Sequence, residues 1–212
     1  MILKVIRKLM QLMLSLAQVI KVELLYLFLG QRAVSNYIRK VNQPMFLLKY
    51  LGVKIGKGTN IWPGLTINCE KRSKYKLLKI GKEVRILWDV IIDLNDEIII
   101  EDYVHVGANN SLITHYSLGN TPLGKSEYPT EYGNIKIKTG VALAWDCTIL
   151  YNSIIGEHTV ISPRSVIKGE VPSFCVFGGN PSRPIKKINR KIWMILSRRF
   201  DGFENGNISS DF

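Results

Sequence analysis

Residues 137–171 read IKTGVALAWDCTILYNSIIGEHTVISPRSVIKGEV, and an aliphatic residue recurs in this stretch at every sixth position. The repeated positions are Ile137, Leu143, Ile149, Ile155, Ile161 and Ile167. Four positions after each stands a small or β-branched residue, namely Val141, Cys147, Ser153, Thr159, Ser165 and Val171. If about one position in three were aliphatic, six consecutive matches would occur by chance at roughly one in a thousand. The same phase recurs upstream at residues 55, 61 and 67, at 80, 86 and 92, and at 100, 106 and 112.

A period of six matches neither the helical repeat of about 3.6 residues nor the two-residue alternation of a long strand. It predicts a short strand, a turn and another short strand, with one inward aliphatic side chain on each face. Three such faces close a triangular coil of about 18 residues, and stacked coils form an all-β solenoid with a continuous aliphatic interior. Turn-forming residues stand between the anchors, for example Gly140, Asp146, Asn152 and Gly156.

This pattern resembles that of the hexapeptide-repeat acyltransferases, most closely the sugar and polysaccharide O-acetyltransferases. The resemblance covers about residues 53–188. It implies a left-handed parallel β-helix that acts as a homotrimer, uses acetyl-CoA as co-substrate and needs no metal. The expected organisation is a helical N-terminal extension over residues 1–52, a β-helix over 53–184 with an inserted loop over 115–136, and a basic helix and tail over 185–212.

The chain has 212 residues and a net charge of +12, with 29 Lys and Arg against 17 Asp and Glu. This excess predicts attraction to an acidic partner: a phosphate-rich cofactor, an anionic membrane face or nucleic acid. No RNA-binding signature or helix-turn-helix pattern accompanies the basic residues, so nucleic acid is the least favoured of the three. The three cysteines show no metal-ligand spacing and leave one unpaired in any disulfide scheme, which favours reduced thiols and a cytoplasmic protein.

Residues 2–29 are apolar but carry a narrow polar stripe at helical spacing, formed by Lys4, Lys8, Gln11, Ser15, Gln18 and Lys21. Lys21 and Glu23 break the apolar run before it reaches the roughly 18 to 20 residues of a membrane span. No small-x-small cleavage site follows the run, which disfavours a signal peptide. Two interpretations remain open: a helix that caps the first coil, or a basic amphipathic helix lying in the interface at the inner face of the membrane.

The six-residue phase is lost between Leu112 and Ile137, and a segment containing glycine and proline that begins at Thr114 and His115 fills the gap. In the resembling acyltransferases, a histidine at the end of a coil, just before an extruded loop, serves as general base. The resemblance therefore implies this role for His115. Imidazole suits the chemistry, because it can accept a hydroxyl proton near neutral pH.

Other polar residues near His115 are candidates for binding the acceptor. Asp89 and Asp93 precede it by about one coil and could reach either the acceptor sugar or the imidazole, and Tyr116 follows it directly. The remaining histidines, His105 and His158, lie within regular repeats and are interpreted as structural.

Donor binding is expected along the later coils. By resemblance, Ala144 and Ser162 take the small-residue positions beside the pantetheine arm. Ala142 stands where the family has a tryptophan, and a tryptophan appears instead at Trp145. The string Val-Pro-Ser at 171–173 and Gly-Gly-Asn-Pro-Ser-Arg-Pro at 178–184 resembles the family's closing motif, and Arg183, Lys186 and Lys187 are expected to bind the CoA phosphates. Aliphatic residues at helical spacing predict a capping helix over 185–200.

The sequence therefore predicts an acetyl-CoA-dependent O-acetyltransferase acting on a sugar hydroxyl, in a surface polysaccharide or its precursor. Two alternatives remain open. One is an N-acetyltransferase acting on an amino sugar, and the other is a non-catalytic hexapeptide-repeat scaffold.

Overall fold

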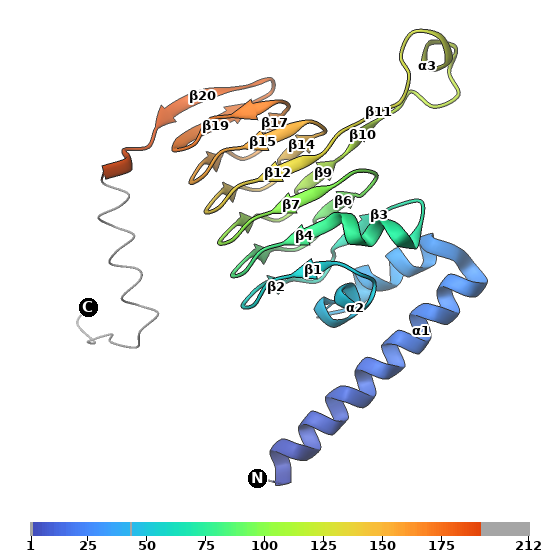
Figure 1. The fold of residues 1–212 in the computed structure, drawn as a ribbon. Helices are drawn as coiled ribbons and strands as arrows, with labels where there is room; N and C mark the ends of the chain where they lie inside the picture. Colours follow the sequence, from blue (N-terminus) through green and yellow to red (C-terminus); the bar gives the residue numbers. More distant parts are fainter. Residues whose placement is uncertain (1, 43, 192–212) are drawn as a thin grey trace.

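The computed structural model describes residues 2–42 and 44–191. Its main body is a three-sided stack of short parallel strands (Figure 1). The first face contains β1 (Lys54–Ile55), β4 (Leu78–Ile80), β7 (Ile98–Ile100), β12 (Ile135–Ile137), β15 (Ser153–Ile155) and β18 (Glu170–Val171). The second contains β2 (Asn60–Ile61), β5 (Arg85–Ile86), β8 (His105–Val106), β13 (Ala142–Leu143), β16 (Val160–Ile161), β19 (Cys175–Gly179) and β20 (Ser182–Lys187). The third contains β3 (Thr66–Asn68), β6 (Ile91–Asp93), β9 (Ser111–Ile113), β14 (Thr148–Leu150) and β17 (Val166–Ile167).

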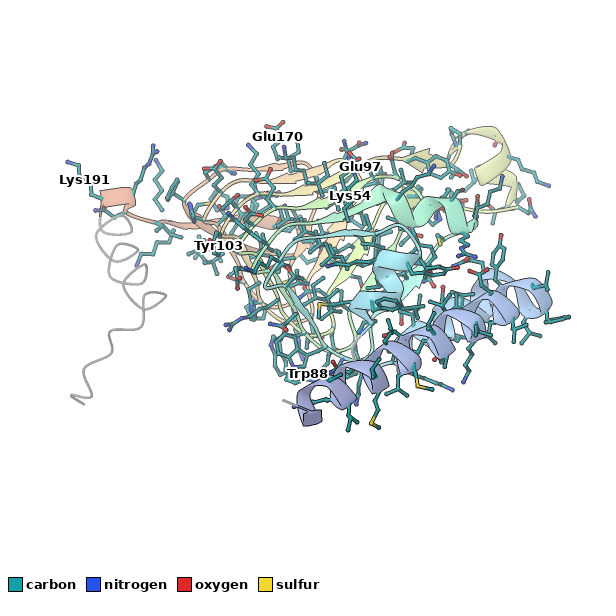
Figure 2. The ribbon with its side chains drawn as sticks, turned by 60° about the horizontal axis from the view of Figure 1, so that its bottom comes forward. Lys54, Trp88, Glu97, Tyr103, Glu170 and Lys191 are labelled. Atoms are coloured by element: carbon teal, nitrogen blue, oxygen red, sulfur yellow. The ribbon has the colours of Figure 1, made fainter. Side chains whose placement is uncertain are left out.

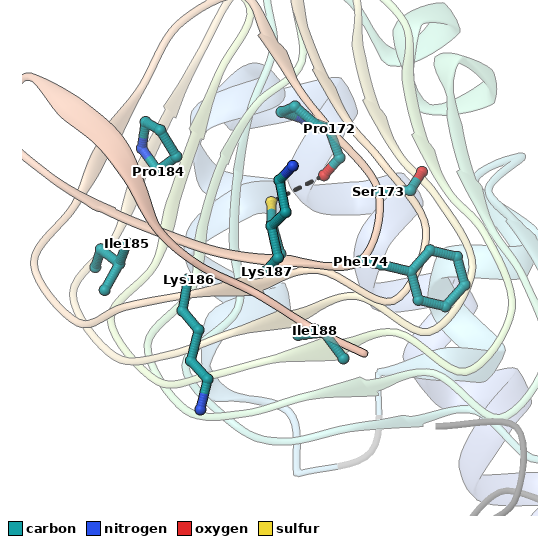
Figure 3. Close-up of a pocket in the computed structure, with 9 residues that line it drawn as sticks. Pro172, Ser173, Phe174, Pro184, Ile185, Lys186, Lys187 and Ile188 are labelled. Carbon is teal, nitrogen blue, oxygen red and sulfur yellow. Dashed lines mark hydrogen bonds between the residues drawn. The ribbon is translucent and has the colours of Figure 1, made fainter. Parts of the chain in front are cut away.

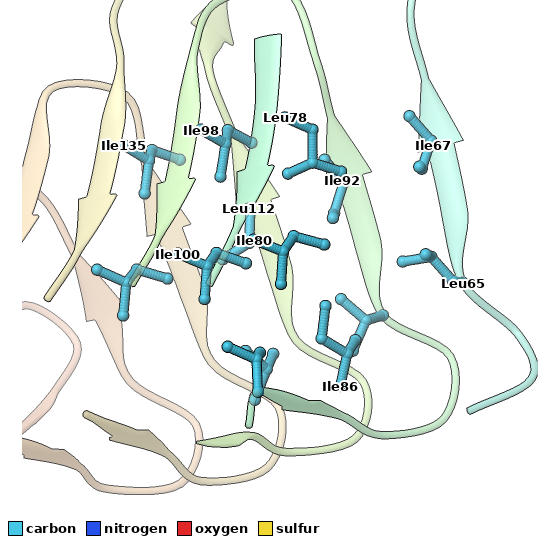
Figure 4. Close-up of a cluster of buried hydrophobic side chains, with 14 of the residues drawn as sticks. Leu65, Ile67, Leu78, Ile80, Ile86, Ile92, Ile98, Ile100, Leu112 and Ile135 are labelled. Atoms are coloured by element: carbon cyan, nitrogen blue, oxygen red, sulfur yellow. The ribbon is translucent and has the colours of Figure 1, made fainter. Parts of the chain in front are cut away.

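The six-residue repeat forms the interior of this stack, as the sequence predicts. All six repeated aliphatic residues from Ile137 to Ile167 are fully buried, and Figure 4 shows equivalent side chains of the earlier coils forming one column. Ile137 pairs with Ile155, and Ile149 pairs with Ile167, so each residue lies beside its equivalent one coil later. The predicted β-helix is therefore confirmed.

One corner shows why the residues between the anchors matter. Where the second face gives way to the third, five successive coils place Gly64, Asp89, Asn109, Asp146 and Arg164 in the left-handed backbone region. Glycine, asparagine and aspartate adopt this conformation at the lowest cost. We call this corner the start edge of the third face, and the opposite corner, where its strands finish, the end edge.

The break in the repeat after Leu112 leaves the stack at the end edge. The excursion consists of a two-residue antiparallel ribbon, β10 (His115–Tyr116) with β11 (Glu131–Tyr132), and a short helix, α3 (Pro122–Ser126). The stack resumes at Ile135, which pairs with Ile98. The inserted segment is therefore two residues shorter than the predicted 115–136, because residues 135 and 136 already belong to β12.

The helical N-terminus both caps the stack and extends beyond it. Helix α1 (Ile2–Lys40) bends at Gly30, and its last turns bury Val34 and Ile38 under the first coil together with Leu47 and Leu48 of α2 (Met45–Tyr50). The part before Gly30 runs along the base of the stack and then away from it (Figures 1 and 2). A 3-10 helix, η1 (Arg72–Leu77), joins β3 to β4 at the end edge.

The C-terminal helix predicted to begin at residue 185 is not present at its start. Residues 182–187 form β20, which folds back antiparallel to β19, with Gly179 opposite Ser182. The tight turn after Gly179 returns the chain along the second face, and backbone pairing then outweighs the helical spacing of Ile185 and Ile188. The rest of that predicted helix, from residue 192, lies outside the described residues.

Removing one buried aliphatic side chain tests the interior column. Ile149→Ala should lower the free energy of unfolding by about 2–5 kcal/mol, because it leaves a cavity between Leu112 and Ile167. Val160→Ala, on the outer side of β16, should change it by less than about 1 kcal/mol. Denaturant titration measures both, and equal losses in the two variants would contradict the assigned interior.

Candidate active site

His115 lies at the end edge of the third face, where strand β9 passes into the ribbon. Thr114, directly before it, is fully buried and fixes this junction. Its hydroxyl donates to the carbonyl of Asp93 at 2.7 Å and accepts the backbone N–H groups of Asn95 and Asp96 at 2.9 and 3.1 Å. The junction therefore ties the His115 segment to the neighbouring coil.

A buried carboxylate orients the imidazole. Asp93 Oδ2 lies 2.6 Å from Nδ1 of His115, and Asp93 is only 8% exposed. A carboxylate in this place selects the tautomer in which Nδ1 carries the proton, which leaves the lone pair on Nε2. No described residue hydrogen-bonds Nε2, and the His115 side chain is 34% exposed, so this nitrogen is accessible from solvent. The pair has the geometry of a positioned base and its orienting acid.

Asn95 completes the support of this pair. Its amide nitrogen donates to Asp93 Oδ1 at 2.8 Å and lies 3.2 Å from His115 Nδ1. Its amide oxygen accepts Lys74 Nζ of η1 at 2.9 Å, which fixes the orientation of the amide. Asn95 is not among the site residues predicted from the sequence. The available signal was the interval of eight rather than six between the anchors Ile92 and Ile100, which places an irregular corner one coil before His115.

The ribbon separates its side chains onto two faces. His115 pairs with Tyr132, and their rings stack at a centroid distance of 6.0 Å and an angle of 22°. Tyr116 is on the opposite face and stacks on Tyr151 of the next coil, at 6.4 Å and 25°. The Tyr151 hydroxyl accepts Lys168 Nζ at 2.7 Å, and this hydrogen bond raises the pKa of Lys168.

Alternation along the strand thus turns Tyr116 away from the imidazole, and its binding of the acceptor stays a prediction. Tyr132, about half exposed, is the aromatic residue beside His115. No sequence signal identifies Tyr132, because the return strand of the loop follows no repeat.

Asp89 is also misplaced in the prediction. It occupies the start edge, with φ of 55°, and its carboxylate lies 3.7 Å from Arg39 of α1. Asp93 and Asp89 are thus at opposite ends of β6, and only Asp93 lies at the His115 edge. Asp93 contacts the imidazole, one of the two partners that the sequence left open, and its contact with the acceptor stays a prediction.

The residues predicted to bind the donor lie at two separate corners. Ala144, Trp145 and Ser162 follow β13 and β16 at the start edge of the third face. Arg183 is opposite Gly178, beside Ser162, and shares this edge. Within one protomer the whole width of the third face, roughly 10 Å for a three-residue strand, separates this group from His115.

Lys186 and Lys187 belong to neither edge of the third face. They line a hollow of about 400 Å³ with Phe174 and Ile188, at the far end of β20 (Figure 3). The antiparallel course of β20 carries them to the corner between the first and second faces, away from Arg183. The structure therefore divides the three predicted phosphate-binding residues.

The other two histidines are in structural positions. His105 belongs to β8 and His158 to a corner, where its ring packs 5.1 Å from that of Phe174. Burial lowers the pKa of both imidazoles. Among the described residues there is no group of three His, Cys, Asp or Glu side chains that could hold a metal ion.

Comparison with known proteins identifies relatives in polysaccharide biosynthesis. No protein-family profile matches the sequence. A protein of Escherichia coli K12 named as a lipopolysaccharide biosynthesis O-acetyl transferase, WbbJ, is 27% identical over 127 residues, which cover 49% of this chain and 65% of WbbJ. The match thus spans slightly less than two thirds of that relative. WcaF of the same organism, named as a colanic acid biosynthesis acetyltransferase, is 27% identical over 145 residues, covering 67% of this chain and 73% of WcaF.

Solved structures show the same architecture. A maltose O-acetyltransferase from Clostridium difficile 630 superposes with a TM-score of 0.57 at 27% identity, covering 68% of this chain and 74% of its own. The hexapeptide-repeat acetyltransferase VCA0836 of Vibrio cholerae, complexed with acetyl-CoA, gives 0.60 at 19% identity, covering 84% and 90%. The fold is therefore the left-handed parallel β-helix. In its repeat, its fold and these similarities, the chain resembles the hexapeptide-repeat acyltransferases.

Proposed function

We propose that this chain is an acetyl-CoA-dependent O-acetyltransferase that acts on a sugar hydroxyl in the synthesis of a surface polysaccharide or its precursor. The observation that carries the proposal is the Asp93–His115 pair, a solvent-accessible imidazole bonded to a buried carboxylate at the edge of the β-helix. The names of WbbJ and WcaF support the acceptor class. The acetyl-CoA complex of the Vibrio cholerae structure supports the donor.

The proposed reaction is direct transfer. Nε2 of His115 removes the proton of the acceptor hydroxyl as its oxygen attacks the thioester carbonyl carbon. Asp93 stabilises the imidazolium that forms, and backbone N–H groups stabilise the oxyanion. The carbon–sulfur bond then breaks, and His115 returns the proton to the leaving thiolate. A non-catalytic scaffold would not need a buried carboxylate that orients an accessible imidazole.

We also propose that the enzyme is a homotrimer. Ala144, Ser162 and Arg183 lie at the start edge of the third face, while His115 lies at its end edge. A donor groove between adjacent prisms would bring the start edge of one protomer to the His115 edge of the next. This arrangement would use the small side chains for close approach of the pantetheine arm and Arg183 for a phosphate. Lys186 and Lys187 are left out of the groove.

The proposed location is the cytoplasm, at the inner face of the membrane. The three cysteines of this chain are all unpaired thiols, as is usual for proteins of a reducing compartment. The surface that supports membrane contact is described in the next subsection. An amino sugar remains the alternative acceptor, and an acceptor panel containing both hydroxyl and amino sugars distinguishes the two.

Acetyl-CoA binding and turnover test the proposed function together. Acetyl-CoA at 100 times its dissociation constant should stabilise the folded protein by about 2.7 kcal/mol, and ATP at the same concentration should not. His115→Ala should keep this stabilisation and lose about 10²- to 10⁴-fold in acetyl transfer to glycosides, measured by release of free thiol. Absence of any stabilisation by acetyl-CoA would reject the donor, and a variant with more than about a tenth of wild-type turnover would reject His115 as the base.

Tyr132 should contribute to acceptor binding. A sugar whose hydroxyl reaches Nε2 of His115 lies next to the Tyr132 ring, so Tyr132→Ala should lower kcat/KM for the acceptor by about 3- to 10-fold. The KM for acetyl-CoA should stay unchanged, and Tyr132→Phe should restore most of the loss. Tyr128→Ala is the matched control, because Tyr128 lies on the same loop and is equally exposed, at 51%. Equal effects of the two alanine variants would contradict this role.

A further inference from the structure

The outer surface of helix α1 before Gly30 is unusually apolar. Its exposed large side chains are Val5, Ile6, Leu9, Met10, Leu12, Met13, Leu14, Leu16, Ile20, Leu24, Tyr26, Leu27, Phe28 and Leu29. We call this set the α1 apolar surface. A soluble monomer seldom leaves an apolar patch of this extent in water, so the surface requires a partner.

The orientation of the helix is the reverse of that in a soluble amphipathic helix. Of the polar stripe, Ser15 and Gln18 are partly covered, and they lie on the helical face that continues into the buried Val22. Gln11 and Ser15 line a hollow with Phe46 of α2. Gln11, Ser15 and Gln18 therefore face the protein, together with Val5, Leu9 and Leu12 of the same hollow. The other large apolar side chains between Ile6 and Leu29 in the set are exposed. Such an arrangement is stable where the surroundings are themselves apolar.

The charges along α1 identify those surroundings. The part of α1 before Gly30 contains four basic residues, Lys4, Arg7, Lys8 and Lys21, and one acidic residue, Glu23. Glu23 is already neutralised, because its two carboxylate oxygens each lie 2.6 Å from the Arg72 guanidinium. An apolar helix with a net positive charge complements a bilayer whose surface lipids are anionic.

The position of α1 favours lying on the membrane over crossing it. The helix passes the test of length and composition for a membrane span, as the one such helix among the described residues. However, Val22 and Leu25 pack against the protein core and the Glu23–Arg72 pair fixes the same turn. Between Lys8 and Lys21 the helix carries no charged residue, and these 12 residues reach about 18 Å, short of the roughly 30 Å hydrocarbon core.

We propose that the α1 apolar surface lies in the interface of an anionic membrane and holds the β-helix against it. Leu27, Phe28 and Leu29, at the bend before Gly30, are 68–73% exposed and form the run of three consecutive apolar residues with the highest exposure in the set. They form the apolar tip that enters the acyl region. The basic residues of α1 remain at the level of the headgroups.

Vesicle flotation of the full chain tests the proposal. The wild type should float with vesicles of phosphatidylglycerol and phosphatidylethanolamine, and much less with pure phosphatidylcholine. Raising the salt from about 0.1 to 0.5 M should weaken its binding severalfold, because the charge attraction is screened. The triple variant Leu27→Ser, Phe28→Ser, Leu29→Ser should partition at least tenfold less.

The matched control is Leu123→Ser, Tyr128→Ser, Ile185→Ser, which removes three exposed, largely apolar side chains from other surfaces and should float like the wild type. Failure of the wild type to bind anionic vesicles overturns the proposal. Light scattering tests whether the surface instead meets a second copy of the chain. A self-associated species that the α1 triple variant abolishes and the control variant keeps would overturn the proposal. Binding that survives both high salt and alkaline carbonate indicates a spanning helix and overturns the proposed orientation. None of these results depends on acetyl transfer.

Discussion

Backbone pairing between residues one coil apart constrains every other feature of this molecule. Before β19, each strand has only two or three residues, so it is held by the neighbouring strands of its face and by its inward aliphatic side chain. Ile149, for example, pairs with Leu112 on one side and with Ile167 on the other. An insertion can therefore occur only at a corner, and it must return the chain in register. The excursion after Thr114 meets both conditions, since β12 resumes beside β7.

The same constraint assembles the candidate site. Asp93 ends β6 and is paired with Ile113 in β9, so the end of one strand is beside the end of the next. Neighbouring strands are about 4.8 Å apart, which brings a side chain after β9 within reach of one at the end of β6. His115 and Asp93 meet for this reason, and Thr114 and Asn95 fix their orientation. A base held in this way keeps its geometry without a movable loop.

Sequence reasoning predicted the parts that the repeat determines and missed the parts that depend on neighbouring strands. The aliphatic column and the corner that carries His115 follow directly from the six-residue phase. Tyr116 and Tyr132 could not be placed, because the side that each faces depends on the pairing of a two-residue ribbon. Lys186 and Lys187 were assigned to a helix on local spacing, whereas pairing with β19 makes that segment a strand. The sequence leaves two interpretations open for the N-terminal helix. The turns after Gly30 cap the stack, as the first interpretation states. The turns before Gly30 present the apolar surface on which the proposed membrane contact rests.

The central claim is that Asp93 holds His115 in the tautomer whose Nε2 can act as a base. The chain contains three histidines, so a ¹⁵N spectrum of histidine-labelled protein is simple, and His115→Gln identifies the signal. For the neutral ring, the account predicts a protonated Nδ1 and an unprotonated Nε2. Observation of the opposite tautomer, with Nδ1 unprotonated, would contradict the account directly.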